Sequence, residues 1–193
     1  MTTSAENGIN PTGNRRSSAR LAAVQALYEM DMVDADADAV LEEFMLKRWT
    51  TGEDEQGKFG QTAEPGEALA AYLGQNGGSD DGDGNGNGDL ALVEPDRDWL
   101  RDLVQGVAEN RDKLDGLIGP VLKGEWTVER LEPLIRVLLR AAIYELDNKP
   151  SVPASVVINE YMNVAHAFFE GPETGLINGI LDRLARDLRT GEL

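Results

Sequence analysis

The sequence predicts an all-α fold, a helical bundle of two small subdomains separated by a long disordered insertion. Apolar residues recur at three- and four-residue spacing over most of the chain, which is typical of amphipathic helices. No segment shows strand alternation or an Asn-Gly turn between β-branched runs. A stretch rich in Gly, Asp and Asn divides the 193 residues into two parts, each long enough for a small helical unit.

The N-terminal subdomain is expected over 15–50, after a flexible tail at 1–14. Its first helix should begin between Arg15 and Ser18, with Ser17 or Ser18 as the capping side chain. The apolar stripe of this helix consists of Leu21, Val24 and Tyr28, and Arg16 and Arg20 project beside it. A second helix is expected over 37–49.

The insertion at 51–95 is rich in acidic residues and glycine, and 66–73 could form a short helix within it. Its run GQNGGSDDGDGNGNGD cannot bury enough apolar surface to offset the entropy of ordering.

The C-terminal bundle is expected over 96–193. Its first helix begins at Pro95 or Asp96, with acidic residues in the first turn, where the helix dipole favours them. A short helix that follows should stop at Gly119-Pro120 or soon after. Pro133 opens the most apolar helix, because its missing N–H costs little at the first position. Two further helices are expected, from about Pro153 to Gly171 and over 174–188.

The formal net charge of −17 is unevenly distributed. Residues 51–98 carry twelve acidic and two basic side chains, whereas residues 1–28 carry three arginines and one glutamate. The low overall pI of about 4.3 is therefore a weak guide to what the folded part binds. The chain has no cysteine, no signal peptide and no apolar run long enough to cross a bilayer, so a soluble cytoplasmic protein is expected.

Catalytic chemistry is not expected, and neither a cofactor nor a metal is predicted. The single histidine, His166, lies on an apolar helix and is interpreted as a buried or half-exposed structural residue, because no nucleophile accompanies it. The stretch from Asp81 to Gly86 matches the first half of a calcium loop, but the twelfth position is Leu92 instead of glutamate. We therefore interpret this stretch as a solvated spacer.

Arg15, Arg16 and Arg20 form the one basic cluster in a neutral-to-basic neighbourhood. They could be ordinary surface arginines at a helix start. Alternatively, they could form a small RNA-contacting patch, because the planar guanidinium binds phosphate through two hydrogen bonds and stacks on bases. So small a patch supplies a modest electrostatic term, so a basic partner would be needed to complete the surface.

Several blocks of the sequence resemble the NusB family of bacterial transcription antitermination factors. The resemblance lies in RRSSARLAAVQALYEMDMV and, more specifically, in LIRVLLRAAIYEL, PASVVINEYMNVAHAFF and LINGILDRLARDL, which follow one another in the family order. It covers about 15–50 and 96–189 and implies a fold of two helical subdomains. It also implies a boxA RNA target and, as partner, the small-subunit ribosomal protein that doubles as NusE, within an RNA polymerase antitermination complex on ribosomal RNA operons.

The resemblance also implies site residues. Arg16 and Arg20, with Arg15 beside them, match the RNA-contacting start of the family's first helix. Ser17 and Ser18 stand where other members often carry further arginines, which puts RNA affinity without the partner in doubt. Tyr28 matches a tyrosine of the partner-binding surface, although packing on the Leu21 and Val24 stripe explains it equally well. The insertion at 51–95 departs from the compact family pattern.

Two other functions remain as alternatives. A related helical domain precedes some ribosomal RNA cytosine methyltransferases, but this sequence contains no cofactor-binding α/β region and no cysteine nucleophile. A homodimer that hides its own RNA surface is the second alternative, and sequence alone does not decide the oligomeric state.

Overall fold

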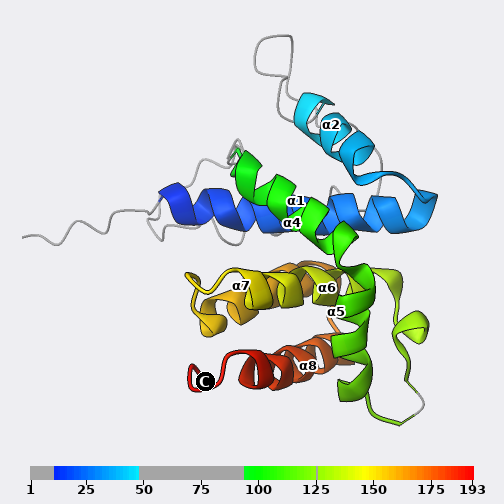
Figure 1. Cartoon of the computed structure of the whole chain (residues 1–193), viewed down its shortest axis with the longest axis vertical. Coiled ribbons are helices and arrows are strands. Elements are labelled where there is room, and N and C mark those ends of the chain that lie inside the picture. Colours follow the sequence, from blue (N-terminus) through cyan, green and yellow to red (C-terminus); the bar gives the residue numbers. More distant parts are fainter. Residues whose placement is uncertain (1–10, 48–93, 125) are drawn as a thin grey trace, which may run out of the picture.

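The computed structural model describes residues 11–47, 94–124 and 126–193, and all regular structure in these residues is helical. Labels follow Figure 1. The α-helices are α1 (Pro11–Val33), α2 (Ala37–Lys47), α4 (Arg97–Glu109), α5 (Arg111–Ile118), α6 (Pro133–Asn148), α7 (Ala154–Phe168) and α8 (Pro172–Leu188). Two short 3₁₀ turns, Gly119–Val121 and Val128–Arg130, lie between α5 and α6. The predicted all-α class is confirmed.

The helices form two groups that share one continuous core (Figure 1). In the first group, α1 packs against α2 and α4, and in the second, α6, α7 and α8 pack against one another with α5 along one side. Helix α1 also contacts α6 and α7, so it joins the two groups. Helix α4 packs most extensively on α1, although it follows the insertion in sequence. The predicted subdomain boundaries, 15–50 and 96–193, stay a prediction.

Helix α1 is buried on nearly all sides over its middle turns. Leu21 and Val24 are fully buried, in agreement with the predicted stripe, and Tyr28 at the end of that stripe is half-buried. The other sides of the helix are also covered, through small residues that let neighbouring helices approach closely: Ala19, Ala22, Ala23 and Ala26. Burial all round is expected of a central helix, and it extends to the polar side chains that α1 carries there.

The start of α1 differs from the prediction. The helix begins at Pro11 instead of between Arg15 and Ser18, so Ser17 and Ser18 lie inside it and do not cap its start. Proline is favoured at the first helical position, because its fixed φ suits the helix and its missing N–H would have no intrahelical partner there. The helix ends at Val33, and Asp34 follows with a positive φ of 52°.

The predicted C-terminal helices are confirmed, with small shifts of their ends. Asp96 caps α4 by accepting the Trp99 backbone N–H at 3.1 Å, and Pro133 is the first residue of α6. Helix α5 ends at Ile118 and the chain continues as the 3₁₀ turn Gly119–Val121. Helix α6 approaches α4 at Gly106, where a Cβ atom would lie 2.0 Å from Cζ of Tyr144.

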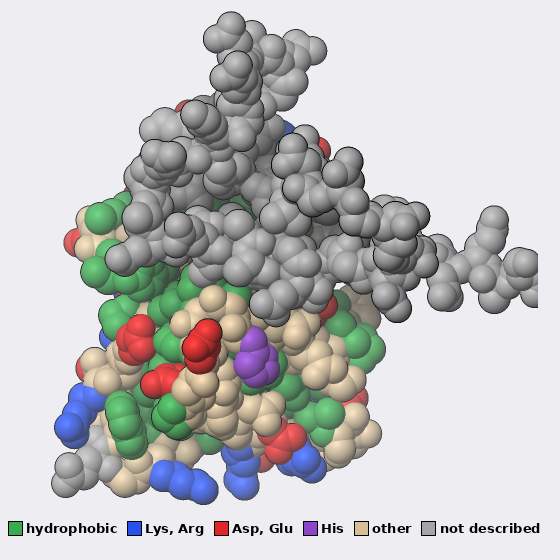
Figure 2. Space-filling view, turned by 180° about the vertical axis from the view of Figure 1, so that it is seen from behind, with side chains coloured by type: hydrophobic (Ala, Val, Ile, Leu, Met, Phe, Trp, Pro, Cys, Tyr) green, Lys and Arg blue, Asp and Glu red, His purple; other side chains and the backbone are tan. Residues whose placement is uncertain are grey.

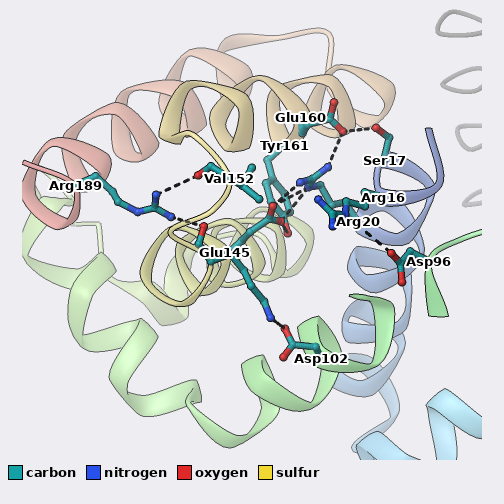
Figure 3. A network of polar contacts seen from close by, with 11 residues as sticks. Arg16, Ser17, Arg20, Asp96, Asp102, Glu145, Val152, Glu160, Tyr161 and Arg189 are labelled. Atoms are coloured by element: carbon teal, nitrogen blue, oxygen red, sulfur yellow. Dashed lines mark hydrogen bonds and ion pairs between the residues drawn. The ribbon is translucent and has the colours of Figure 1, made fainter. Parts of the chain in front are cut away.

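The loop between α6 and α7 is held by an arginine that follows α8. The Arg189 guanidinium is buried and donates hydrogen bonds to the carbonyl oxygens of Leu146 (2.6 Å), Lys149 (2.8 Å) and Val152 (3.1 Å). Figure 3 shows the contact with Val152. Glu192 accepts a further bond from Arg189 and another from the backbone N–H of Ala154, at the start of α7. Two residues that follow α8, Arg189 and Glu192, therefore fix the shape of the α6–α7 connection.

Several predictions fall outside the described residues: the first ten residues of the tail, the short helix at 66–73 and the calcium-like stretch at 81–92. Within the described part of the chain, no cluster of three or more His, Cys, Asp or Glu side chains could hold a metal ion. None of the described helices combines the length and the apolar character that crossing a membrane requires.

Candidate nucleic-acid interface

Arg15 is exposed on α1, beside the segment that leads into α4. Its Nε donates a hydrogen bond of 3.3 Å to the carbonyl oxygen of Glu94. The backbone N–H of Asp96 in turn donates to the Arg15 carbonyl oxygen at 3.0 Å. Arg15 is thus at the surface, and it lies one turn inside a helix that begins at Pro11.

Arg16 is also at the surface, with its guanidinium centred 4.4 Å from the centroid of the Trp99 indole ring. Its Nε lies 4.0 Å from a carboxylate oxygen of Asp96, and 40% of the side chain is exposed. The indole is partly buried and packs against the core, and a cation stacked on such a ring gains about 0.5–1 kcal/mol or somewhat more, which restricts the guanidinium to the ring without removing it from solvent. Arg16 is therefore oriented and accessible, as a group that contacts a phosphate must be.

Arg20 occupies a different position from the predicted one. It was expected to project beside the apolar stripe, but its residue is only 3% exposed. Its Nη2 and Nε lie 2.5 Å and 2.9 Å from the two carboxylate oxygens of Glu145 on α6, and its Nη1 lies 3.1 Å from Glu160 on α7 (Figure 3). The prediction of a projecting Arg20 is wrong, because two acidic side chains of the C-terminal helices draw the guanidinium into the interior.

The network around Arg20 is completed by two hydroxyl groups. Tyr161 donates to Glu145 at 3.1 Å, and Ser17 donates to Glu160 at 2.5 Å (Figure 3). Burial lowers the pKa of Arg20, but the hydrogen bond and charge of Glu145 outweigh it and raise the pKa above its ordinary value. Burial, followed by the charge of Glu145, also raises the pKa of Tyr161 well above its ordinary value. The positive charge of Arg20 is thus neutralised by two carboxylates and is not available to a ligand.

A further cation, which the sequence did not point to, reaches the same indole. The ammonium of Lys149, which follows the last turn of α6, lies 5.2 Å from the Trp99 ring centroid. It also lies 2.7 Å from Oδ2 of Asp102 on α4, an ion pair by distance that is not a well-aligned hydrogen bond. No local pattern points to Lys149, because the contact joins residues fifty positions apart.

Tyr28 is half-buried and packs against the core. Three residues further along α1, the buried Asp31 carboxylate pairs with Arg136 at 2.8 Å, Arg140 at 3.4 Å and Arg111. These pairs anchor the end of α1 to α5 and α6. The position of Tyr28 agrees with both interpretations of this residue, since its ring contacts the core while part of it remains accessible.

His166 is exposed on α7, whereas the sequence analysis expected a buried or half-exposed residue. Figure 2 shows it on the rear face, near acidic side chains. Val164 and Ala165 take the buried positions of this turn, and His166 lies beyond their stripe.

Comparison with known proteins gives consistent matches. The NusB family model matches residues 80–186. A protein of Bradyrhizobium sp. named transcription antitermination protein NusB is 37% identical over 180 residues, which cover 93% of this chain and 86% of the relative. A Caulobacter vibrioides protein of the same name is 41% identical, over 92% of this chain and 99% of the relative. The solved structure of T. maritima NusB superposes with a TM-score of 0.61 at 24% identity, covering 89% of this chain and 91% of that one.

Proposed function

The chain belongs to the NusB family, and on this premise we propose that it is a non-catalytic, RNA-binding transcription antitermination factor. In this proposal it binds boxA RNA together with the small-subunit ribosomal protein that acts as NusE. The complex then joins RNA polymerase in the cytoplasm and supports transcription of ribosomal RNA operons.

The observation that carries the proposal is the accessible arginine pair at the start of α1. Arg15 is exposed, and Arg16 is held on an indole with 40% of its side chain exposed. Guanidinium groups at such a surface can contact phosphate through two hydrogen bonds or stack on an unpaired base. The buried Arg20 contributes indirectly in this proposal, because its bonds to Glu145 and Glu160 fix α1 against α6 and α7.

The acidic surroundings support the need for a basic partner. Glu94 and Asp96 lie directly beside Arg15 and Arg16, and the chain as a whole carries a net charge of −17. The arginine pair alone offers a small counterion-release term against this background. A basic ribosomal protein would add positive charge next to the RNA, and the opposite potentials of the two proteins would speed their association. Tyr28 is the residue that we assign to this partner surface.

Fluorescence anisotropy with a labelled boxA RNA tests the proposal, with and without the ribosomal partner. The variants are Arg15→Gln and Arg16→Gln, and the control is Arg186→Gln, an exposed arginine on α8 paired with Asp182. We expect the partner to tighten wild-type binding, and each of the first two variants to weaken it and to lower the salt dependence by about 0.7 in slope. Equal affinity with and without the partner, or equal losses in all three variants, would contradict the proposal.

A homodimer that covers its own RNA surface is the competing proposal. Light scattering at the concentrations of the binding assay separates the two. A dimer that persists in the presence of RNA and partner would argue against the adaptor function.

A further inference from the structure

We propose that Lys149 is a further RNA-contacting side chain, which acts with Arg16 on one surface centred on Trp99. The inference rests on the proposed function and extends it to a residue outside α1. The surface consists of Arg16, Trp99 and Lys149, with Asp96 and Asp102 as its acidic members, and we call it the Trp99 surface.

The geometry brings together cations from two distant parts of the chain. The Arg16 guanidinium and the Lys149 ammonium lie 4.4 Å and 5.2 Å from the centroid of the same indole. Both side chains are partly accessible, at 40% for Arg16 and 24% for Lys149. Arg20 also approaches the ring, at 5.8 Å, but its charge is balanced by Glu145 and Glu160. Two partly accessible cations therefore contact one aromatic ring.

Lys149 is also unusually well positioned for a surface lysine. The carbonyl oxygen of its own residue accepts a hydrogen bond of 2.8 Å from the buried Arg189, which fixes the backbone of the loop. The indole and Asp102 then restrict the side chain itself. A lysine ordinarily loses much rotamer entropy when it is held in place. The Lys149 side chain is already restricted in the free protein, so it loses less rotamer entropy when it contacts a phosphate.

Two N–H donors beside this surface, Nε1 of Trp99 and Nε of Arg16, are buried and have no hydrogen-bond partner. Because they are closed to solvent, an arriving phosphate contacts the charged ends of the side chains and not these atoms. A ligand rich in acceptor oxygens, as a phosphate backbone is, would compensate the charges of the Arg16 guanidinium and the Lys149 ammonium.

The acidic residues of the Trp99 surface determine whether a charge change should strengthen or weaken RNA binding. Asp102 holds the Lys149 ammonium at 2.7 Å, and a phosphate must compete with this carboxylate for the same charge. Removing the carboxylate charge should therefore strengthen RNA binding, whereas removing the ammonium charge should weaken it. A second pair, Lys113 with Asp147 at 2.6 Å, has the same chemistry between α5 and α6, with its lysine 57% exposed. It provides a matched control.

The experiment measures anisotropy of a labelled boxA RNA with the ribosomal partner present, over a series of salt concentrations. The variants are Lys149→Gln and Asp102→Asn, and the controls are Lys113→Gln and Asp147→Asn. We expect Lys149→Gln to weaken binding by up to about tenfold and to lower the slope of log affinity against log salt by about 0.7. We expect Asp102→Asn to tighten binding and Lys149→Arg to retain it, with both controls near wild type.

The outcomes separate this inference from the proposed function. If Lys149→Gln and Lys113→Gln behave alike while Arg16→Gln loses affinity, the Trp99 surface is overturned and the proposed function stands. If wild type binds no RNA with the partner at low salt, both fail. Trp99→Leu gives a second readout, because it removes the support of both cations and should weaken binding more than either single charge change. Circular dichroism of each variant verifies that the fold is retained.

Discussion

Replacing Arg20 should destabilise the protein far more than replacing an arginine at the surface. In Arg20→Met, Glu145 stays fully buried and loses all its bonds to the guanidinium, while Tyr161 alone still donates to it. Leaving one member of a buried ion pair uncompensated costs about 3–5 kcal/mol. For a domain of ordinary stability, this is a large part of the total free energy of unfolding, which is about 5–15 kcal/mol.

Urea denaturation followed by circular dichroism at pH 7 measures this loss. Arg186→Met is the control, because Arg186 forms an exposed pair with Asp182 within α8, and solvent screening leaves such a pair little effect on stability. The double variant Arg20→Met/Glu145→Leu removes both charges and should recover much of the loss, since apolar side chains can replace a buried ion pair at little cost.

The size of the loss decides the argument. A deficit of Arg20→Met under about 1 kcal/mol at pH 7, or a double variant no more stable than the single one, would refute the buried-pair argument.

Three further predictions follow from the packing. Gly106→Ala should destabilise the protein by about 1–3 kcal/mol, because the added Cβ would clash with the Tyr144 ring. Gly116→Ala has open space around it and should stabilise the protein by up to about 1 kcal/mol. Thermal unfolding of the two variants measures both effects. Arg189→Gln should cost at least about 1.5–3 kcal/mol in urea titrations, since three carbonyl groups lose a charged donor. Because the pKa of Tyr161 is raised in the folded protein, the free energy of unfolding should fall as the pH rises above the unfolded value of about 10. Tyr161→Phe should remove part of that fall. If the free energy of unfolding depends on pH equally in the variant and in wild type, Tyr161 is not the source.

Helix positions in the C-terminal half could be predicted because local chemistry determines them. Pro133 can begin a helix but cannot continue one, and Asp96 offers a side-chain acceptor to the first turn of α4. The start of α1 was misplaced because two serines resembled caps, while Pro11 provides an equally local start signal further upstream.

The interior role of Arg20 could not be read from its neighbours in sequence. Its partner Glu145 lies 125 positions away, and a lysine or arginine beside an apolar stripe is usually exposed. One signal was available: Glu145 stands within the most apolar helix of the chain, and a carboxylate there requires a buried partner. Arg15 and Arg16 were placed correctly at the surface because they precede the part of α1 that other helices enclose.

The Arg189 contacts bear on the order in which the molecule can mature on the ribosome. The start of α1 is synthesised first, but the loop that carries Lys149 obtains its three hydrogen bonds only when Arg189 has left the exit tunnel. Nascent chains that stop short of this residue leave the carbonyl groups of Leu146, Lys149 and Val152 without this donor. A variant that lacks residues 189–193 would thus retain Arg15 and Arg16, but the loop that carries Lys149 would lose the hydrogen bonds that fix its backbone.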